Sequence, residues 1–175
     1  MNNNEILIRL RDALDIKNTD MVEIFKLGGI ELTSEEVNMM LIEEKDSEHN
    51  EVDNNQDIEE KKANLECNNY SLESFLNGLI IFKRGEPDPI PGKPKNPPLS
   101  IMSSKSVNNV MLKKLKIALS LTAEDMIDIF EEAGVIVTKG ELSPLFRKEG
   151  HKHYKKCSDI FAINFLDGLA IKNRI

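Results

Sequence analysis

The segment HKHYKKC, residues 151–157, holds the side chains best suited to metal chemistry. His151, His153 and Cys157 are all of types that ligate Zn²⁺. Structural zinc sites usually need four ligands, and the chain has three histidines and two cysteines with no second ligand cluster. The lysines within the segment would also repel a cation. We therefore interpret it as an exposed basic loop, and we expect neither a metal nor another cofactor.

The two cysteines, Cys67 and Cys157, occupy equivalent places in two similar segments. A redox pair is conceivable, but free cysteine is commonly buried as a small apolar side chain. We predict that both thiols pack in the core at the start of a helix. Two cysteines do not make a disulfide framework, so a reducing, cytoplasmic setting is the default expectation.

Two asparagine pairs, Asn3–Asn4 and Asn108–Asn109, are the most prominent polar residues that recur. We expect Asn4 and Asn109 to be the N-caps of helices, a position that favours Asn. The other asparagine of each pair could bind an anion or a partner's carbonyl at the start of the helix. All four are candidate binding residues.

Arg84 and Arg174 also recur, each near the end of a predicted helix. A cation there complements the helix dipole, and a contact with phosphate is the alternative, so both join the candidate binding residues. For catalysis the chain offers no Gly-rich phosphate loop, nucleophile elbow or HExxH segment. We name no catalytic residue and favour a function other than catalysis.

These recurrences belong to a longer internal repeat. Residues 3–37 match residues 108–142 without a gap, and residues 74–84 match residues 164–174. Leucines spaced by three and four, and Thr-x-x-Glu or Thr-x-x-Asp capping boxes, predict that each copy forms four helices. Gly29 and Gly134 are placed to end the second helix with a positive φ. Gly78 and Gly168 lie inside the fourth helix, where we expect close helix–helix approach.

The repeat sets the predicted fold class and domains. We expect an all-α fold of two tandem, pseudo-symmetric four-helix repeats packed together about a twofold axis. The first repeat spans residues 1–85, with an acidic insertion at about 45–62 that the second copy lacks. Residues 86–106 form a Pro-rich linker with six of the seven prolines, and residues 107–175 form the second repeat.

The net charge of −7 comes mostly from one segment. Residues 43–66 hold 10 acidic and 3 basic residues, so the rest of the chain is close to neutral. This distribution argues against general attraction to nucleic acid or anionic membrane. No apolar run approaches the roughly 20 residues that span a bilayer.

Nucleic-acid binding through the second repeat is the alternative that the charge pattern leaves open. A helix-turn-helix is disfavoured, because residues 34–44 are acidic and Pro144 would end or bend the matching helix. A weaker contact could use six lysines, which a solvated helical face explains equally well: Lys113, Lys114, Lys116, Lys152, Lys155 and Lys156.

The segments NNVMLKKLKIALSL (108–121) and SFLNGLIIFKRG (74–85) resemble the YehS-like family of bacterial proteins, which are built from a tandem domain of unknown function. The resemblance covers nearly the whole chain, apart from the acidic insertion and the long connector. It implies an all-helical, bacterial, cytoplasmic protein and carries no established activity.

Three hypotheses of function remain. The leading one is a non-enzymatic helical module that presents a face to a protein partner. The second is a nucleic-acid-associated regulator that uses the basic second repeat. The third is a sensor that binds a small molecule or anion at the seam between the repeats.

Overall fold

The computed structural model describes residues 1–42, 65–85 and 106–174, and within these ranges all regular structure is helical. The predicted all-α fold is confirmed. The acidic insertion and all but Ser106 of the Pro-rich linker lie outside the described residues. The helices, in chain order, are α1 (Asn3–Leu14), α2 (Asn18–Leu27), α3 (Ser34–Met40), α6 (Asn69–Arg84), α7 (Val107–Ala118), α8 (Ala123–Glu132), α9 (Lys139–Leu142), the 3₁₀ helix η3 (Ser143–Phe146) and α10 (Asp159–Arg174).

The predicted capping boxes begin three of these helices. Thr33, Thr122 and Thr138 are the N-caps of α3, α8 and α9, and each hydroxyl accepts a backbone N–H at 3.1–3.2 Å. Helix α9 is only four residues long, and Pro144 follows it at the start of η3. The prediction that Pro144 would end or bend a helix here is therefore confirmed, since the α-helix ends at Leu142.

Glycines set where the outer helices pack against the inner ones. A Cβ on Gly78 of α6 would lie 1.9 Å from the carbonyl oxygen of Ile24 in α2. A Cβ on Gly168 of α10 would lie 1.9 Å from the carbonyl oxygen of Ile129 in α8. The predicted close approach is thus confirmed at both positions, and no larger residue fits without moving a helix.

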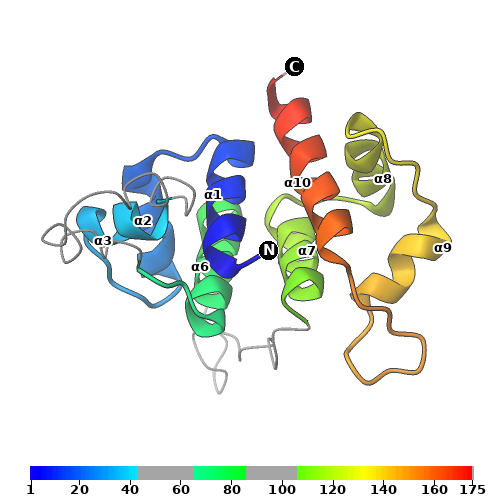
Figure 1. Ribbon diagram of the computed structural model, residues 1–175, viewed down its shortest axis with the longest axis horizontal. Coiled ribbons are helices and arrows are strands. Elements are labelled where there is room, and N and C mark those ends of the chain that lie inside the picture. Colours follow the sequence, from blue (N-terminus) through cyan, green and yellow to red (C-terminus); the bar gives the residue numbers. More distant parts are fainter. Residues whose placement is uncertain (43–64, 86–105, 175) are drawn as a thin grey trace, which may run out of the picture.

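Four helices, α1, α6, α7 and α10, form the centre of the molecule, with α2 and α3 on one side and α8 and α9 on the other (Figure 1). Their N-terminal ends are linked by polar contacts. The Asn3 amide donates to Asn69 at 2.8 Å, joining α1 to α6. Asp159 of α10 accepts from Asn108 of α7 and from the amino group of Met1, both at 2.8 Å.

The C-terminal ends of the same helices are also linked. Asn173 of α10 donates to the carbonyl oxygen of Ala13 in α1 at 2.7 Å. Arg84 of α6 donates to the carbonyl oxygen of Ile117 in α7 at 3.3 Å. Because N-terminal ends meet N-terminal ends and C-terminal ends meet C-terminal ends, all four central helices run in the same direction.

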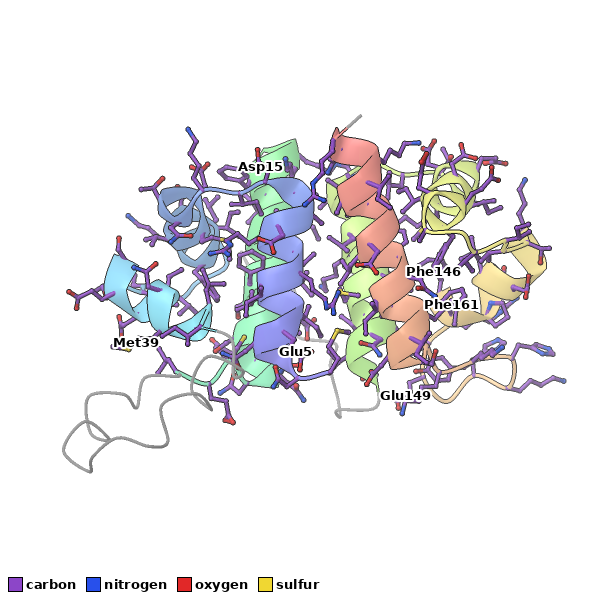
Figure 2. The ribbon with its side chains drawn as sticks, turned by 45° about the horizontal axis from the view of Figure 1, so that its top comes forward. Glu5, Asp15, Met39, Phe146, Glu149 and Phe161 are labelled. Carbon is purple, nitrogen blue, oxygen red and sulfur yellow. The ribbon has the colours of Figure 1, made fainter. Side chains whose placement is uncertain are left out.

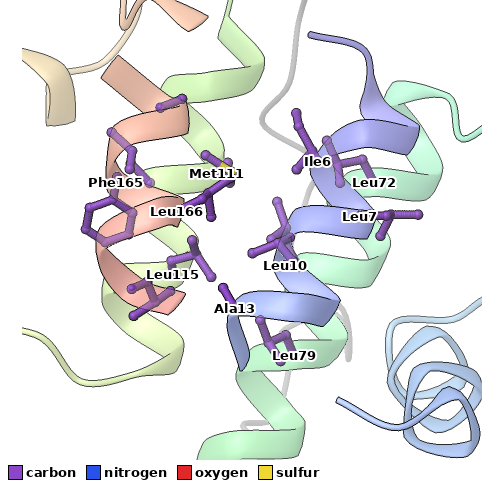
Figure 3. Close-up of a cluster of buried hydrophobic side chains, with 14 of the residues drawn as sticks. Ile6, Leu7, Leu10, Ala13, Leu72, Leu79, Met111, Leu115, Phe165 and Leu166 are labelled. Carbon is purple, nitrogen blue, oxygen red and sulfur yellow. The ribbon is translucent and has the colours of Figure 1, made fainter. Parts of the chain in front are cut away.

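The core continues across the boundary between the halves (Figure 3). Leu10 and Ala13 of α1 face the side chains of Met111, Leu115 and Leu166, which come from α7 and α10. All five are at most 3% exposed. The main contacts between the halves are α1 with α10 and α6 with α7, pairs that correspond to each other under the sequence repeat. The pseudo-symmetry of the whole chain stays a prediction.

Candidate functional site

The asparagine pairs do not begin their helices as predicted. The N-cap of α1 is Asn2, whose side chain accepts from the backbone N–H of Glu5 at 2.8 Å, and α7 begins after Ser106. Asn4 and Asn109 lie inside α1 and α7, so the prediction that they are N-caps is wrong. Their side-chain amides instead form hydrogen bonds with backbone groups that are distant in the sequence.

Asn109 joins three backbone groups of that loop. Its Nδ2 donates to the carbonyl oxygens of Leu145 and Lys155 at 3.1 and 2.9 Å, and its Oδ1 accepts from the N–H of Cys157 at 2.9 Å. Both amide hydrogens are therefore used within the chain.

Asn4 makes the matching set of bonds in the first half. It donates to the carbonyl oxygens of Met40 and Leu65 at 3.0 and 2.8 Å and accepts from the N–H of Cys67 at 3.0 Å. We call these two groups the asparagine clasps. Each fixes the backbone just before the fourth helix of its half, which is a structural role. Binding by these asparagines stays a prediction.

Each cysteine is part of an asparagine clasp, because its backbone N–H donates to the clasp asparagine. Cys67 and Cys157 are 2% and 1% exposed, and neither is in a disulfide. Burial raises the pKa of both thiols to about 12, so they stay protonated at neutral pH. The prediction that both thiols pack in the core at the start of a helix is confirmed.

The basic loop does not assemble a metal site. His151 and His153 are exposed, and the backbone N–H of His153 donates to Nδ1 of His151 at 3.0 Å. Cys157, in contrast, is buried. Across the described ranges, no three His, Cys, Asp or Glu side chains converge as ligands.

One of the six lysines proposed for nucleic acid is not available to a ligand. Lys114 is turned inward, so its inclusion is a correction: its Nζ lies 2.6 Å from Oδ1 of Asn77 and 3.4 Å from Oε2 of Glu73, both on α6. The Lys114 and Glu73 side chains are 11% and 1% exposed. Burial lowers the pKa of Lys114, partly opposed by the carboxylate of Glu73.

The other five lysines are divided between a helix and a loop. Lys116 has its Nζ 6.0 Å from the ring centroid of Phe146, a cation–π geometry. Lys113 is exposed on α7, whereas Lys152, Lys155 and Lys156 are exposed in the loop before α10.

Basic residues gather at the C-terminal ends of the central helices. We call this region the basic end; in Figure 2, Asp15 marks it and Glu5 marks the opposite end of α1. Every central helix has basic residues in its last turn: Arg11, Lys83, Arg84, Lys116, Lys172 and Arg174. Four helix dipoles contribute about −2 elementary charges here, Asp12 and Asp15 add two more, and Asp125 of α8 adds a third close to Lys172. The six cations therefore exceed the negative charge by about one.

Apolar side chains are exposed on the same last turns. Phe82 of α6, Ile117 of α7 and Ile171 of α10 are 37%, 38% and 40% exposed. Arg84 lies in the last turn of α6 and donates to the carbonyl oxygen of Ile117 near the end of α7, and its dipole role stays a prediction. The structure thus places Arg84 and Arg174 at one end of the bundle and the asparagines Asn3, Asn4, Asn108 and Asn109 at the other.

A pocket of about 380 Å³ opens at the basic end, between α1 of the first half and α10 of the second. Its lining mixes both charges: Arg11, Asp12, Ala13, Asp15, Ile16, Asn173 and Arg174. Arg11 and Asp12 are also paired with each other at 3.4 Å. Among the predicted candidates, Arg174 is the residue that lines this pocket.

Sequence reasoning missed the buried pair between Glu73 and Lys114. One signal was available, because Glu73 is the only charged residue between Asn69 and Phe82 of the fourth helix. The repeat was a second signal. It matches Lys114 with Arg9 and therefore indicates that both halves have a cation at this position. Neither signal identifies the partner on another helix.

No helix in the parts of the chain that the structure describes is both long and apolar enough to cross a membrane. The chain was also compared with known proteins. No solved structure matches it. It is 33% identical to "Uncharacterized protein YehS" of Escherichia coli (strain K12), and the match covers 100% of this chain and 98% of that protein. The family model described as "Protein of unknown function (DUF1456)" matches residues 3–85 and 108–174. The chain therefore belongs to this family, and the predicted resemblance to YehS-like proteins is confirmed.

Proposed function

We propose that the protein is a non-enzymatic interaction module whose basic end docks a protein partner. The observation that carries this proposal is the combination at that end of exposed Phe82, Ile117 and Ile171 with Arg84 and Arg174. Aromatic residues and Arg are enriched in protein–protein interfaces, and Lys is depleted there. The net positive charge favours a partner segment that carries Asp or Glu beside apolar residues.

The scaffold supports this use because the candidate residues lie on helices. The last turns of α6 and α7 are joined by Arg84, and those of α1 and α10 by Asn173. A face held by such contacts needs little reordering when a partner binds, which lowers the entropic cost of association.

The test is affinity purification of the tagged chain with Phe82→Asp and Arg84→Glu. Both residues are exposed, so we expect the variants to fold and to lose the proteins that co-purify with the wild type. Ile136→Asp is the matched control, because Ile136 is 84% exposed on the loop between α8 and α9. A partner that binds all three variants equally would contradict the proposal.

The pocket between α1 and α10 favours a second candidate, the sensor of a small anion at the seam. Arg11 and Arg174 come from different halves, so a ligand that bound both would bridge the halves. The test is thermal unfolding with inorganic phosphate or acetate. The expected result is a higher Tm for the wild type and for Arg84→Ala, but not for Arg174→Ala. Unchanged Tm values with both anions would remove this candidate.

A further inference from the structure

The pocket at the basic end is formed before any ligand arrives. It lies between α1 and α10, and its volume of about 380 Å³ is in the range of sites that take a small molecule, roughly 300–1,000 Å³. Two buried apolar residues of the first half, Ala13 and Ile16, are part of its lining. The carbonyl oxygen of Ala13 accepts from Asn173 at 2.7 Å, which holds the two walls together. A ligand would therefore need little rearrangement of the chain.

The charged side chains that line the pocket are balanced in number. Arg11 and Arg174 supply two positive charges, and Asp12 and Asp15 supply two negative ones. Arg11 and Asp12 are paired with each other at 3.4 Å. Neither Arg174 nor Asp15 forms an ion pair with another residue in the described ranges. The pocket thus offers a ligand one cation from the second half and one anion from the first.

The backbone adds negative potential to this balance. Helix α1 ends at Leu14 and α10 ends at Arg174, so the pocket lies at the C-terminal ends of two helices. Each such end carries about half a negative charge, and its last carbonyl oxygens have no partner within the helix. A ligand with a single anionic group would be attracted by Arg174 but repelled by Asp15 and by these carbonyl oxygens. An ammonium group on the same ligand would reverse that repulsion.

We propose that the ligand of this pocket is a small zwitterion with a carboxylate and an ammonium group, the chemistry of a free α-amino acid. This inference rests on the second candidate function, the sensor at the seam, and narrows the class of its ligand. The carboxylate binds the guanidinium group of Arg174, whose N–H donors match carboxylate geometry. The ammonium group binds the carboxylate of Asp15. The bound ligand then joins the second half to the first.

Three related compounds test the proposal on the full chain. L-Alanine carries both charges, N-acetyl-L-alanine keeps the carboxylate alone, and L-alaninamide keeps the ammonium group alone. Each compound, and acetate, is titrated into isotopically labelled protein, and the dissociation constant is taken from the shifts of the backbone amide signals. We expect alanine to bind about threefold or more tightly than either analogue, because each analogue lacks one exposed ion pair.

Asp15→Asn isolates the contact with the ammonium group. Asp15 is the C-cap of α1 and has a φ of 52°, a conformation that Asn also tolerates, so the variant should keep the fold. In this variant alanine should lose its advantage over N-acetylalanine. Arg174→Gln should instead weaken the binding of both compounds and leave that of alaninamide unchanged. Arg84→Gln is the control, because Arg84 is outside the pocket lining, and it should bind all three compounds like the wild type.

The outcomes separate this inference from the candidate function beneath it. If alanine and N-acetylalanine bind the wild type equally, the zwitterion is overturned and the anion sensor still stands. If alanine binds more tightly but Asp15→Asn leaves that advantage intact, the assignment of the ammonium group is overturned. If neither acetate nor any of the three compounds shifts the amide signals, both the inference and the anion sensor are overturned.

Discussion

Asn4 and Asn109 show what can and cannot be predicted from single residues. Their recurrence marks them correctly as structurally important, but the N-cap is Asn2 in α1, and α7 begins after Ser106. The NNN segment offers three asparagines near one helix start, and propensity does not distinguish among them. The groups that Asn109 binds lie 36 to 48 residues away, so local sequence carries no signal for them.

Replacing Asn109 by Asp tests the clasp with almost no change of shape. Asp retains an acceptor for the Cys157 N–H but places a carboxylate against the carbonyl oxygens of Leu145 and Lys155. We expect Asn109→Asp to lower the free energy of unfolding by roughly 3 kcal/mol or more at neutral pH. Urea unfolding followed by circular dichroism measures it.

Asn38→Asp is the matched control for that variant. Asn38 is exposed and uses its Oδ1 to accept from Asn18 at 2.7 Å, a bond that Asp can also make. Its free energy of unfolding should stay close to that of the wild type. Equal losses in the two variants would show that the Asn109 amide hydrogens do not support the fold.

Because the two thiols are buried, we predict that the free energy of unfolding falls at alkaline pH. The pKa of Cys67 and of Cys157 is raised by burial from 9.0 to about 12 in the folded state. Below pH 9 both states keep the protons, so the contribution is fully present. Between pH 9 and 12 the unfolded chain loses protons that the folded chain retains. The free energy of unfolding should therefore fall by about 1 kcal/mol per pH unit for each thiol.

The comparison that isolates the thiols is the wild type against Cys67→Ala with Cys157→Ala. The double variant should show a flatter decline across this range, measured by urea unfolding at each pH. Lys114, whose pKa is lowered by burial, has the opposite effect below pH 10.5, but it is present in both proteins and cancels. Identical slopes would contradict the assignment.

At the scale of elements, the recurring glycines predicted where two helices pack closely. Gly78 and Gly168 reduce helix propensity in both copies, which indicates that a packing constraint outweighs that cost. The structure identifies the constraint as the backbone of α2 and α8. The sequence could not name those helices, because an internal glycine indicates a close approach but not its partner.

Alanine at either glycine should separate the packed helices. Gly78→Ala and Gly168→Ala each place a methyl group 1.9 Å from a carbonyl oxygen, and we expect losses of about 3 kcal/mol or more in the free energy of unfolding. Gly140→Ala in α9 is the control, since the nearest atom to its Cβ would be 3.9 Å away. That variant should be as stable as the wild type. A loss of the same size at Gly140 would mean that the close approach of the helices does not cause the loss of stability.

At the scale of the whole molecule, the sequence predicted that the halves pack together, but not how. The parallel direction of the four central helices comes from contacts at both ends, such as Asn3 with Asn69 and Asn173 with Ala13. Parallel neighbours align their dipoles unfavourably, so the basic last turns have an electrostatic role as well as a proposed binding role. The basic end exists only in the assembled molecule, because residues 83–84 and 172–174 are far apart in the sequence.

The acidic insertion is predicted to be dispensable for this architecture. The second copy of the repeat lacks it, so deletion of residues 46–60, which lie outside the described residues, should leave the helical content unchanged. Far-ultraviolet circular dichroism of the deletion variant tests this prediction. A large loss of helical signal per residue would mean that the insertion is part of the fold.

The most direct test of the proposed function is affinity purification of the tagged chain from its own host at native abundance, with and without nuclease. The account predicts a protein that co-elutes in stoichiometric amount, survives nuclease and is released by salt, as expected for a charged interface. A set of co-eluting molecules that disappears with nuclease would contradict it. That outcome would favour the exposed lysines of the second half as a nucleic-acid surface.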